Sequence, residues 1–252
     1  MSSLATHKVR ENLYSVTTRR ASGKNADGRM VQAESLLEYD FFSILDFDFR
    51  VEKYKEQAIV IPWRTPSGQY RRYTPDVLVK FSQTYNRTYP HLKATIFEVK
   101  PSEIVRSDWD QLLPKYRGVR RSLQGTCVPF KVITERHLNP TFVTNCKFLN
   151  EYSDKALRLD RLQPYQSEMR TTIAETARAL GVTTPKLLLE SVSKVFDTQT
   201  VLIPWIWNQF HCGPLGMQMD MMEPLTMDTE IWHHSARHRV PLWLRRENDW
   251  YR

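Results

Sequence analysis

The first regular pattern of hydrophobic residues along the chain is that of a helix. Within residues 32–47, Leu37, Phe41, Ile44 and Leu45 recur mainly three or four positions apart. This spacing places the four side chains on one face of a helix, because an α-helix completes a turn about every 3.6 residues. We therefore predict an amphipathic helix over this segment.

Shorter hydrophobic runs follow, and their length is typical of strands. Residues 58–61 are entirely apolar, residues 66–68 read Pro-Ser-Gly, and residues 69–81 end in Asp-Val-Leu-Val-Lys-Phe. Two apolar segments around such a turn signal predict a strand, a hairpin turn and a second strand. Residues 95–100 and 130–134 predict two further strands.

Helical spacing returns between the last two strands. Trp109, Leu112 and Tyr116 lie three or four positions apart within residues 107–123, where Pro114 should bend or interrupt the helix. The predicted order is helix, three strands, helix and strand. This order indicates an α/β fold in which helices flank a mixed sheet.

The second half of the chain has mainly helical patterns. A boundary is expected near residues 137–145, where Pro140 should break regular structure, and helices are expected at 147–162 and 165–180. Residues 174–190 then predict a helix, a Gly-centred turn and a helix, with Thr184 as N-cap and Pro185 as the first helical residue. The Trp- and Met-rich residues 195–231 are expected to supply a β-wing, so this half is predicted to be winged-helix-like.

The charge of the chain is divided unevenly between its halves. The net charge is +8, with 23 Lys and Arg against 15 Asp and Glu over residues 1–140, and 13 against 13 over residues 141–252. A basic first half indicates a polyanionic partner, although a charge of this size also serves solubility. We expect three parts: a basic arm at 1–29, a domain at 30–140, and a partner-binding domain with a C-terminal tail at 141–252.

Other compositional features exclude several classes of protein. The longest apolar stretch, Val201–Trp207, contains Pro204 and is much shorter than a membrane-spanning helix. The N-terminus lacks the pattern of a secretory signal, and the three cysteines form no CxxC pair. We expect a cytoplasmic protein with no membrane partner.

The residues with the clearest chemistry lie on two of the predicted strands. Glu98 and Lys100 alternate with Phe97 and Val99, so the acid and the amine emerge on the same face of their strand. Asp76 follows a proline at the start of the preceding strand. Charged groups on one face of a buried strand are expected to pair or to bind something, because desolvating either charge alone is costly.

This Pro-Asp and Glu-x-Lys arrangement resembles that of the PD-(D/E)xK nuclease superfamily. Two carboxylates and the Val99 carbonyl are hard oxygen ligands suited to Mg²⁺, for which Mn²⁺ should substitute. The metal would activate a water for attack on a phosphodiester, and Lys100 would add positive charge near the developing negative charge. The alternative reading is that Asp76, Glu98 and Lys100 form structural ion pairs.

The order and spacing of the elements over residues 30–135 are similar, more specifically, to those of the TnsA endonucleases of heteromeric transposons. That resemblance implies a restriction-endonuclease-like first domain with Glu38, Asp76, Glu98 and Lys100 as catalytic residues. All but Lys100 would be metal ligands. Glu34, one turn before Glu38, would lie behind the site or in solvent.

The family resemblance also implies a reaction and its partners. A TnsA-like enzyme would cleave the 5′, non-transferred strand at transposon ends in double-stranded DNA, with a TnsB-type transposase and a TnsC-type AAA+ ATPase as partners. Two alternatives stay open: a stand-alone restriction or repair endonuclease, and a non-catalytic winged-helix DNA-binding adaptor. Residues predicted to contact DNA phosphates are Arg71, Arg72, Arg117, Arg120 and Arg121.

Overall fold

The computed structural model describes residues 33, 35–83, 94–153, 157, 164–196, 199–211, 216–236 and 241. These residues form two compact units. Unit 1 contains the described residues up to Leu138, apart from Phe47–Phe49; unit 2 contains Phe47–Phe49 and the described residues from Asn139 onward. The predicted arm at 1–29, Glu34 and the C-terminal tail lie outside the described residues.

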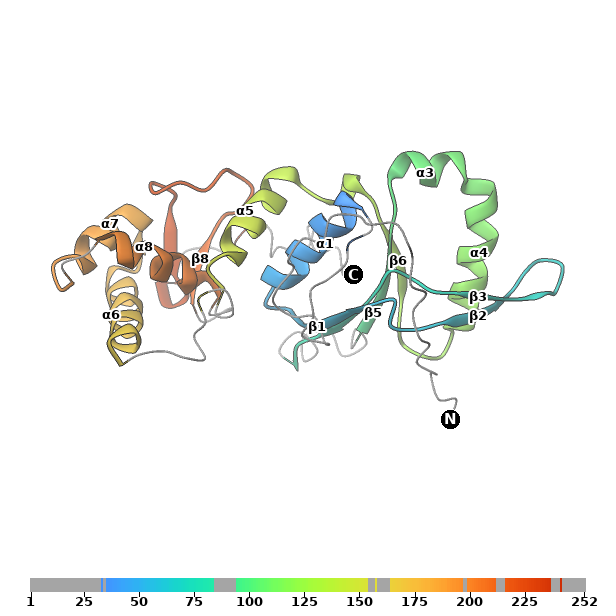
Figure 1. Cartoon of the computed structure of the whole chain (residues 1–252), viewed down its shortest axis with the longest axis horizontal. Coiled ribbons are helices and arrows are strands. Elements are labelled where there is room, and N and C mark those ends of the chain that lie inside the picture. Colours follow the sequence, from blue (N-terminus) through green and yellow to red (C-terminus); the bar gives the residue numbers. More distant parts are fainter. Residues whose placement is uncertain are drawn as a thin grey trace. The chain divides into compact units, whose positions relative to one another are not determined.

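Unit 1 is built on a mixed four-stranded sheet in the order β1-β4-β5-β6 (Figure 1). The pairs β1–β4 and β4–β5 are antiparallel, and β5–β6 is parallel. Helix α1 packs on this sheet, where Phe41 lies 5.2 Å from Phe97 between ring centroids. The bounds of these elements are α1 Leu36–Phe47, β1 Val51–Glu56, β4 Val77–Phe81, β5 Ala94–Val99 and β6 Phe130–Ile133. The mixed α/β architecture predicted from the sequence is confirmed.

Strand β1 was not predicted, and a β-bulge explains why. Its two buried residues, Val51 and Tyr54, are three positions apart. Pairing with β4 shifts register between Val51 and Lys53, so one extra residue is accommodated there. The bulge therefore removes the strict alternation by which a strand is recognised in a sequence.

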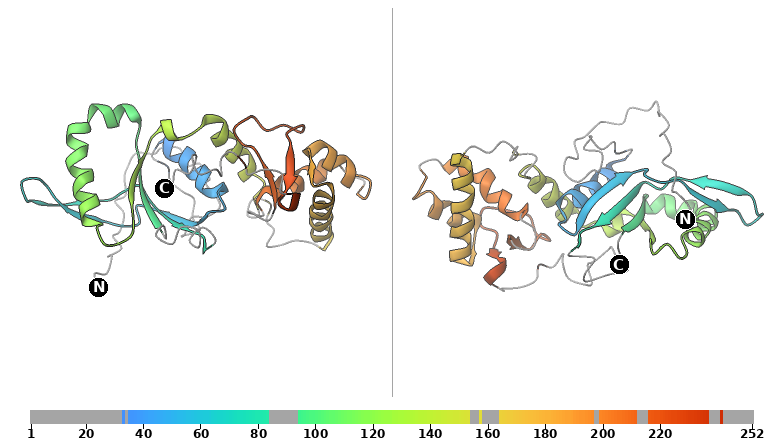
Figure 2. Two further views of the ribbon diagram at one scale, coloured as in Figure 1. Left: turned by 180° about the vertical axis from the view of Figure 1, so that it is seen from behind. Right: turned by 90° about the horizontal axis from the view of Figure 1, so that it is seen from below.

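The predicted hairpin is present as a separate two-stranded ribbon. Strands β2 (Ile61–Arg64) and β3 (Tyr70–Tyr73) pair antiparallel, and Gly68 in the turn has a φ of 83°. Figure 2 shows the ribbon extending beyond the four-stranded sheet, beside α4. Two details of the prediction were wrong: the first strand lies at Ile61–Arg64 instead of residues 58–61, and residues 69–81 divide into β3 and β4 in different sheets.

The segment between β5 and β6 contains two helices, α3 (Ser102–Ser107) and α4 (Trp109–Ser122). Helix α4 continues through Pro114, although that residue cannot donate a backbone hydrogen bond. Helix α4 packs tightly on the ribbon, because a Cβ atom at Gly118 would lie 2.5 Å from the Trp63 ring. The Ser122 hydroxyl also donates to the Pro62 carbonyl at 2.7 Å. These contacts hold the base of the ribbon against α4.

Unit 2 combines helices with a three-stranded antiparallel sheet in the order β7-β9-β8. The predicted helix at 147–162 was wrong, since α5 begins at Pro140 and ends at Asn150. Asn139 caps this helix by accepting a hydrogen bond from Phe142 N at 3.0 Å. Proline is tolerated at the first helical position, so Pro140 begins a helix instead of breaking one. The other bounds are α6 Pro164–Leu180, β7 Val182–Thr183, α7 Pro185–Val192, α8 Gln199–Asn208, β8 Met217–Met219 and β9 Ile231–His233.

The predicted helix, turn and helix of unit 2 are confirmed. Gly181 has a φ of 70°, and the Thr184 side chain accepts a hydrogen bond from Leu187 N at 3.2 Å at the start of α7. Residues 195–231 were predicted to form a β-wing, but they also contain helix α8, whose Trp205 and Trp207 are buried. Within the described ranges, no helix has the length and apolar character that crossing a membrane requires.

Candidate active site

Two strand ends bring three of the predicted catalytic residues together. The antiparallel register that pairs Val77 with Phe97 carries Asp76, one residue before β4, toward Glu98 on β5. An Asp76 carboxylate oxygen accepts a hydrogen bond from Val99 N at 2.6 Å. The Lys100 ammonium lies 3.8 Å from a Glu98 oxygen. Asp76, Glu98 and Lys100 therefore occupy one corner of unit 1.

Glu98 is the most enclosed acid of this group, with only 4% of its surface exposed. One of its oxygens lies 3.8 Å from both the Lys100 and the Lys115 ammonium groups, and the other accepts a hydrogen bond from the Tyr73 hydroxyl. Burial of a carboxylate is costly unless it is paired and hydrogen-bonded. The two lysines and the tyrosine provide this compensation.

Lys115 and Tyr73 were not identified from the sequence. Lys115 lies on the apolar face of α4, three residues after Leu112 and one before Tyr116, both of which are buried. Its ammonium is 4.6 Å from the centre of the Tyr73 ring and 5.0 Å from that of Tyr116. The sequence did contain one signal for Lys115, namely a lysine within the hydrophobic face of an amphipathic helix. It did not indicate the partner of that lysine, because Glu98 lies on a different element.

Glu38 approaches the same corner from the first turn of α1. The Ser35 hydroxyl donates to a Glu38 carboxylate oxygen at 3.1 Å and accepts from Glu38 N at 3.1 Å. The charge of Glu38 contributes to the raised pKa of Asp76, so the predicted helix acid lies within electrostatic reach of the strand acids. Glu38 is thus linked to Asp76, Glu98 and Lys100 through its electrostatic effect on Asp76.

The ionisation of Asp76 is strongly influenced by this environment. Burial, followed by the charges of Glu98 and Glu38, raises the pKa of Asp76 to about 7, while the Val99 N–H and Lys100 act in the opposite direction. Burial and the two neighbouring carboxylates together therefore outweigh the nearby N–H donor and lysine. An added cation would relieve the repulsion between the carboxylates.

The pKa values of the groups on the α4 side of Glu98 are also shifted. Burial, together with the charge of Glu98, raises the pKa of both Tyr73 and Tyr116. Burial lowers the pKa of Lys115, although Glu98 acts in the opposite direction. Both tyrosines therefore stay protonated near neutral pH, which keeps the Tyr73 hydroxyl a donor to Glu98.

The donor set fits a divalent metal that prefers oxygen ligands. Asp76, Glu98 and Glu38 supply carboxylates, and the charges of Glu98 and Glu38 add to burial in raising the pKa of Asp76. In the part of the chain that the structure describes, no three Asp, Glu, His or Cys side chains are grouped closely enough to hold a metal ion, so a metal bound here would need further ligands. Water ligands would thus complete the coordination, as Mg²⁺ commonly requires.

The predicted phosphate-contacting arginines lie outside this buried corner. All five are exposed: Arg71 and Arg72 on the ribbon, and Arg117, Arg120 and Arg121 on α4. Arg71 pairs across the ribbon with the buried Trp63, whereas Arg72 pairs with the exposed Pro62. Adjacent strand residues point to opposite faces, so the two ribbon arginines are on different sides.

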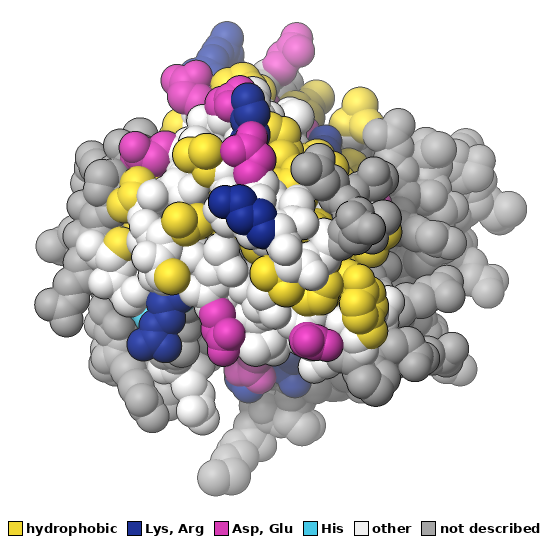
Figure 3. Space-filling model, turned by 90° about the vertical axis from the view of Figure 1, so that its left-hand side faces the viewer, with side chains coloured by type: hydrophobic (Ala, Val, Ile, Leu, Met, Phe, Trp, Pro, Cys, Tyr) yellow, Lys and Arg dark blue, Asp and Glu magenta, His cyan; other side chains and the backbone are white. Residues whose placement is uncertain are grey.

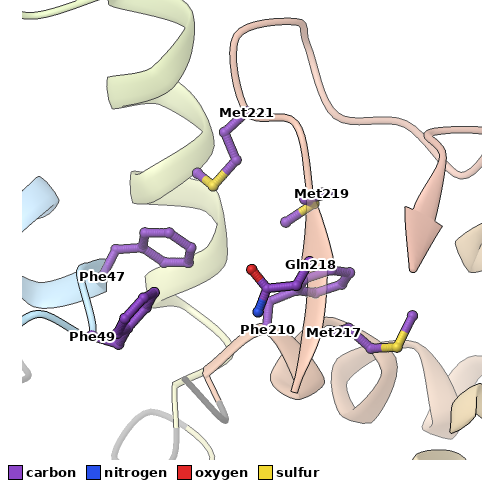
Figure 4. Close-up of a pocket in the computed structure, with 7 residues that line it drawn as sticks. All are labelled: Phe47, Phe49, Phe210, Met217, Gln218, Met219 and Met221. Carbon is purple, nitrogen blue, oxygen red and sulfur yellow. The ribbon is translucent and has the colours of Figure 1, made fainter. Parts of the chain in front are cut away.

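Unit 2 contains an apolar crevice of a different kind (Figure 4). Its lining comprises Phe47, Phe49, Phe210, Met217, Gln218, Met219 and Met221. No titratable side chain lines it, so the crevice provides no acid or base. The crevice is therefore not a candidate catalytic site.

Comparison with known proteins agrees with the site in unit 1. Residues 48–135 match a family model described as "TnsA-like endonuclease N terminal". Comparison with curated proteins gave no match. The matched segment runs from just before β1 to the short helix after β6 and contains Asp76, Glu98 and Lys100, whereas Glu38 precedes it. Residues 48–135 of this chain are therefore similar to a TnsA-like endonuclease N-terminal domain, which supports a nuclease.

Proposed function

We propose that the chain is a metal-dependent DNA endonuclease of a heteromeric cut-and-paste transposase, which cleaves the 5′, non-transferred strand at transposon ends. The observation that carries this proposal is the meeting of Asp76, Glu98 and Lys100 at the ends of β4 and β5 within the TnsA-like domain. Carboxylates beside an ammonium group are suited to phosphodiester hydrolysis, in which negative charge develops on phosphate oxygens.

Glu38, Asp76, Glu98 and the Val99 carbonyl would hold Mg²⁺ or Mn²⁺. When bound, the metal supplies activation of the attacking water and charge stabilisation at phosphorus. The Val99 N–H fixes the orientation of Asp76. Tyr73 and the two lysines fix that of Glu98.

Lys100 is the cation best placed to act on the substrate. Its side chain is 27% exposed, compared with 5% for Glu98, so its ammonium is accessible while its partner is enclosed. An ammonium group has three donors, so Lys100 can contact Glu98 and still donate to a phosphate oxygen or to the attacking water. An ammonium group at this position stabilises the transition state, in which negative charge on the phosphate increases, more than it stabilises the singly charged phosphodiester.

Unit 2 is the part of the chain that we propose to bind protein partners. The order α6-β7-α7-α8-β8-β9, in which β7 pairs with β9, is the order expected of a winged-helix-like domain. On α7 the exposed Leu187 lies among charges of both signs. A mixed surface of this kind suits a protein better than a polyanion. We propose that this surface of α7 binds a TnsB-type transposase or a TnsC-type AAA+ ATPase.

The decisive experiment compares Asp76→Ala with Asp110→Ala in cleavage of transposon-end duplex by the chain reconstituted with its partners. Asp110 is an exposed acid in the first turn of α4 and serves as the matched control. Asp76→Ala should abolish 5′-strand cleavage and leave DNA binding nearly unchanged, while Asp110→Ala should cleave like wild type. Mg²⁺ and Mn²⁺ should support cleavage, Ca²⁺ should support little, and chelation should stop it.

Three other outcomes would contradict parts of the proposal. Cleavage that persists in Asp76→Ala or in chelator would reject the metal site. Efficient cleavage of bare DNA by the chain alone would favour a stand-alone restriction or repair enzyme. DNA binding with no cleavage under any condition would favour a non-catalytic adaptor.

A further inference from the structure

The β2–β3 ribbon has one covered face and one open face. Helix α4 lies along one side of the ribbon (Figure 2). Trp63 is on this side, and its cross-strand partner Arg71 shares that face. Buried residues of the ribbon and of α4 belong to one hydrophobic core cluster, among them Ile61, Trp63, Tyr73, Leu112, Tyr116 and Val119.

The other side of the ribbon, which we call the outer face, is identified by the strand register. Directly opposed residues of an antiparallel pair share a face, and neighbouring positions alternate. Arg64 pairs with Tyr70 and Pro62 pairs with Arg72, so these four residues share the outer face. All four are exposed. The outer face is therefore available to a ligand, whereas the face toward α4 is not.

The outer face carries positive charge without compensation. Residues 57–75 contain no Asp or Glu. Among the described residues, neither Arg64 nor Arg72 forms an ion pair. The two arginines are diagonal neighbours across the strands, a separation of about 7–8 Å. Phosphates two positions apart on one strand of duplex are separated by about 7 Å along the helix axis, so the two arginines match one phosphate chain.

An aromatic ring on the outer face orients one of these arginines. Tyr70 is 69% exposed, and the Arg64 guanidinium lies 4.4 Å from the centre of its ring and donates to its hydroxyl. This stacking limits the conformations of both side chains without burying them. An Arg–Tyr pair that is ordered before contact is suited to binding, because less conformational entropy is lost.

The outer face begins beside the candidate active site. Tyr73, which follows Arg72 directly, donates its hydroxyl hydrogen bond to Glu98, and Asp76 comes three residues later. From Tyr73 to Tyr70 the strand covers three residues, or about 10 Å. A phosphate chain that leaves the site along the outer face would therefore meet Arg72 first and Arg64 about three nucleotides from the scissile phosphate.

We propose that the outer face of the ribbon lies along one phosphate chain of the duplex, next to the scissile phosphate, with Arg64 and Arg72 bound to phosphates of that chain. Arg71, on the side that α4 covers, takes no part in this contact. Guanidinium groups without acidic neighbours favour phosphate over a protein surface of mixed charge. This proposal rests on the proposed function, since the substrate is the same duplex.

The test measures binding, so that it does not depend on cleavage. In the Asp76→Asn background, the affinity of the full chain for a transposon-end duplex is measured over a salt series. Arg64→Ala and Arg72→Ala should each lower affinity about tenfold at low salt and reduce the salt slope by about one, as expected for one lost phosphate contact. An unrelated duplex of the same length should show the same losses, because phosphate contacts carry no sequence information.

Two controls separate a contact of the outer face from a general effect of charge. Arg71→Ala removes the same charge from the adjacent residue on the other side of the ribbon, and it should change affinity less than about threefold with little change of salt slope. Lys194→Ala, which removes an exposed cation of unit 2, should change neither quantity. A melting curve for each variant verifies folding, and Arg64→Lys and Arg72→Lys should restore most of the salt slope.

Neutral methylphosphonate linkages in the duplex test the single phosphate chain. Placed within about four nucleotides of the cleavage position, they should weaken binding of the Asp76→Asn chain on one strand and not on the other. The same substitution should have little further effect on the chain that also carries Arg64→Ala and Arg72→Ala, because the contacts are already lost.

Several results would overturn the proposal. Equal losses for Arg71→Ala and Arg64→Ala would indicate diffuse attraction instead of contact by one face, and sensitivity to neutral linkages on both strands would exclude a single chain. Unchanged DNA affinity with loss of a protein partner would assign the outer face to that partner. Loss of DNA affinity in the Arg64 and Arg72 variants, combined with no cleavage by wild type, would support the outer face and reject only the proposed nuclease function.

Discussion

The two units distribute charge on their surfaces in different ways. In unit 1, residues 57–75 and 111–134 contain eight Lys and Arg and no Asp or Glu, and the fold packs these two segments together through α4 and the ribbon. The side of unit 2 that Figure 3 shows instead has basic, acidic and hydrophobic side chains interspersed.

This contrast shows why a helix-turn-helix pattern alone is a weak guide to DNA binding. Helix α7 has a well-formed N-terminus and an exposed face, yet Lys186 is accompanied by Glu190 and by the exposed Leu187. The segments around the candidate active site have no such pattern, but they concentrate cations. We therefore expect nuclease chemistry and most DNA affinity in unit 1, and protein contacts in unit 2.

The largest expected difference between the units is in cleavage. Lys100→Ala should reduce the cleavage rate about 10³-fold, roughly 4 kcal/mol in the barrier, because it removes a cation beside the reacting phosphate. Lys194→Ala, which removes an exposed cation of unit 2 beyond the end of α7, should leave the rate unchanged. Single-turnover measurements with saturating partners compare the two, and equal effects would refute the assignment of catalysis to unit 1.

The next effect is a pH dependence of stability that originates at Asp76. Its folded-state pKa of about 7 exceeds the ordinary value of 3.8, so the folded protein binds this proton more tightly than the unfolded chain does. The resulting stability is present below about pH 4 and is lost as the pH rises through about 7. Between pH 4 and 8 in chelator, the free energy of unfolding of wild type should fall by about 4 kcal/mol relative to Asp76→Asn.

Urea titrations at each pH measure this difference. Added Mg²⁺ should reduce the loss at high pH, because a bound cation favours the ionised carboxylate. A difference between the two proteins that stays constant from pH 4 to 8 would contradict the raised pKa of Asp76.

A third prediction concerns the packing that holds the ribbon on α4. Gly118→Ala should lower the free energy of unfolding by about 2 kcal/mol, since the new Cβ would meet the Trp63 ring at 2.5 Å. Helix propensity alone predicts the opposite sign, because alanine favours helices over glycine. Thermal unfolding measures the sign, and combining Gly118→Ala with Trp63→Leu should recover part of the loss.

The smallest effect is expected at Lys115. Because it contacts Glu98 from behind the site, Lys115→Gln should lower the maximal cleavage rate about tenfold with little change in the DNA concentration needed for half-maximal rate. Lys115→Arg should restore part of the rate and the shape of the pH profile. A purely structural lysine would instead change the melting temperature while leaving the rate of the folded fraction unaltered.

Local patterns in the sequence were sufficient for several elements and for the core of the candidate site. The helix before the sheet, the hairpin turn at Gly68 and the cap at Thr184 depend on neighbouring residues, so their signals are contained in short segments. Asp76, Glu98 and Lys100 could likewise be identified from the sequence. Glu98 and Lys100 are two positions apart at the end of one strand, and Asp76 lies at the start of the preceding strand.

Only the tertiary structure determined which distant groups complete the site. Lys115 and Tyr73 reach Glu98 because α4 and the ribbon pack against β5, and the sequence pattern contains no measure of that packing. The bulge in β1 likewise depends on pairing with β4. The start of α5 is different: the Asn139 cap and proline at the first helical position are local signals that the prediction did not use. Short-range propensities act over a few residues, whereas the position of a charge relative to its partner is set by register and packing between segments far apart along the chain.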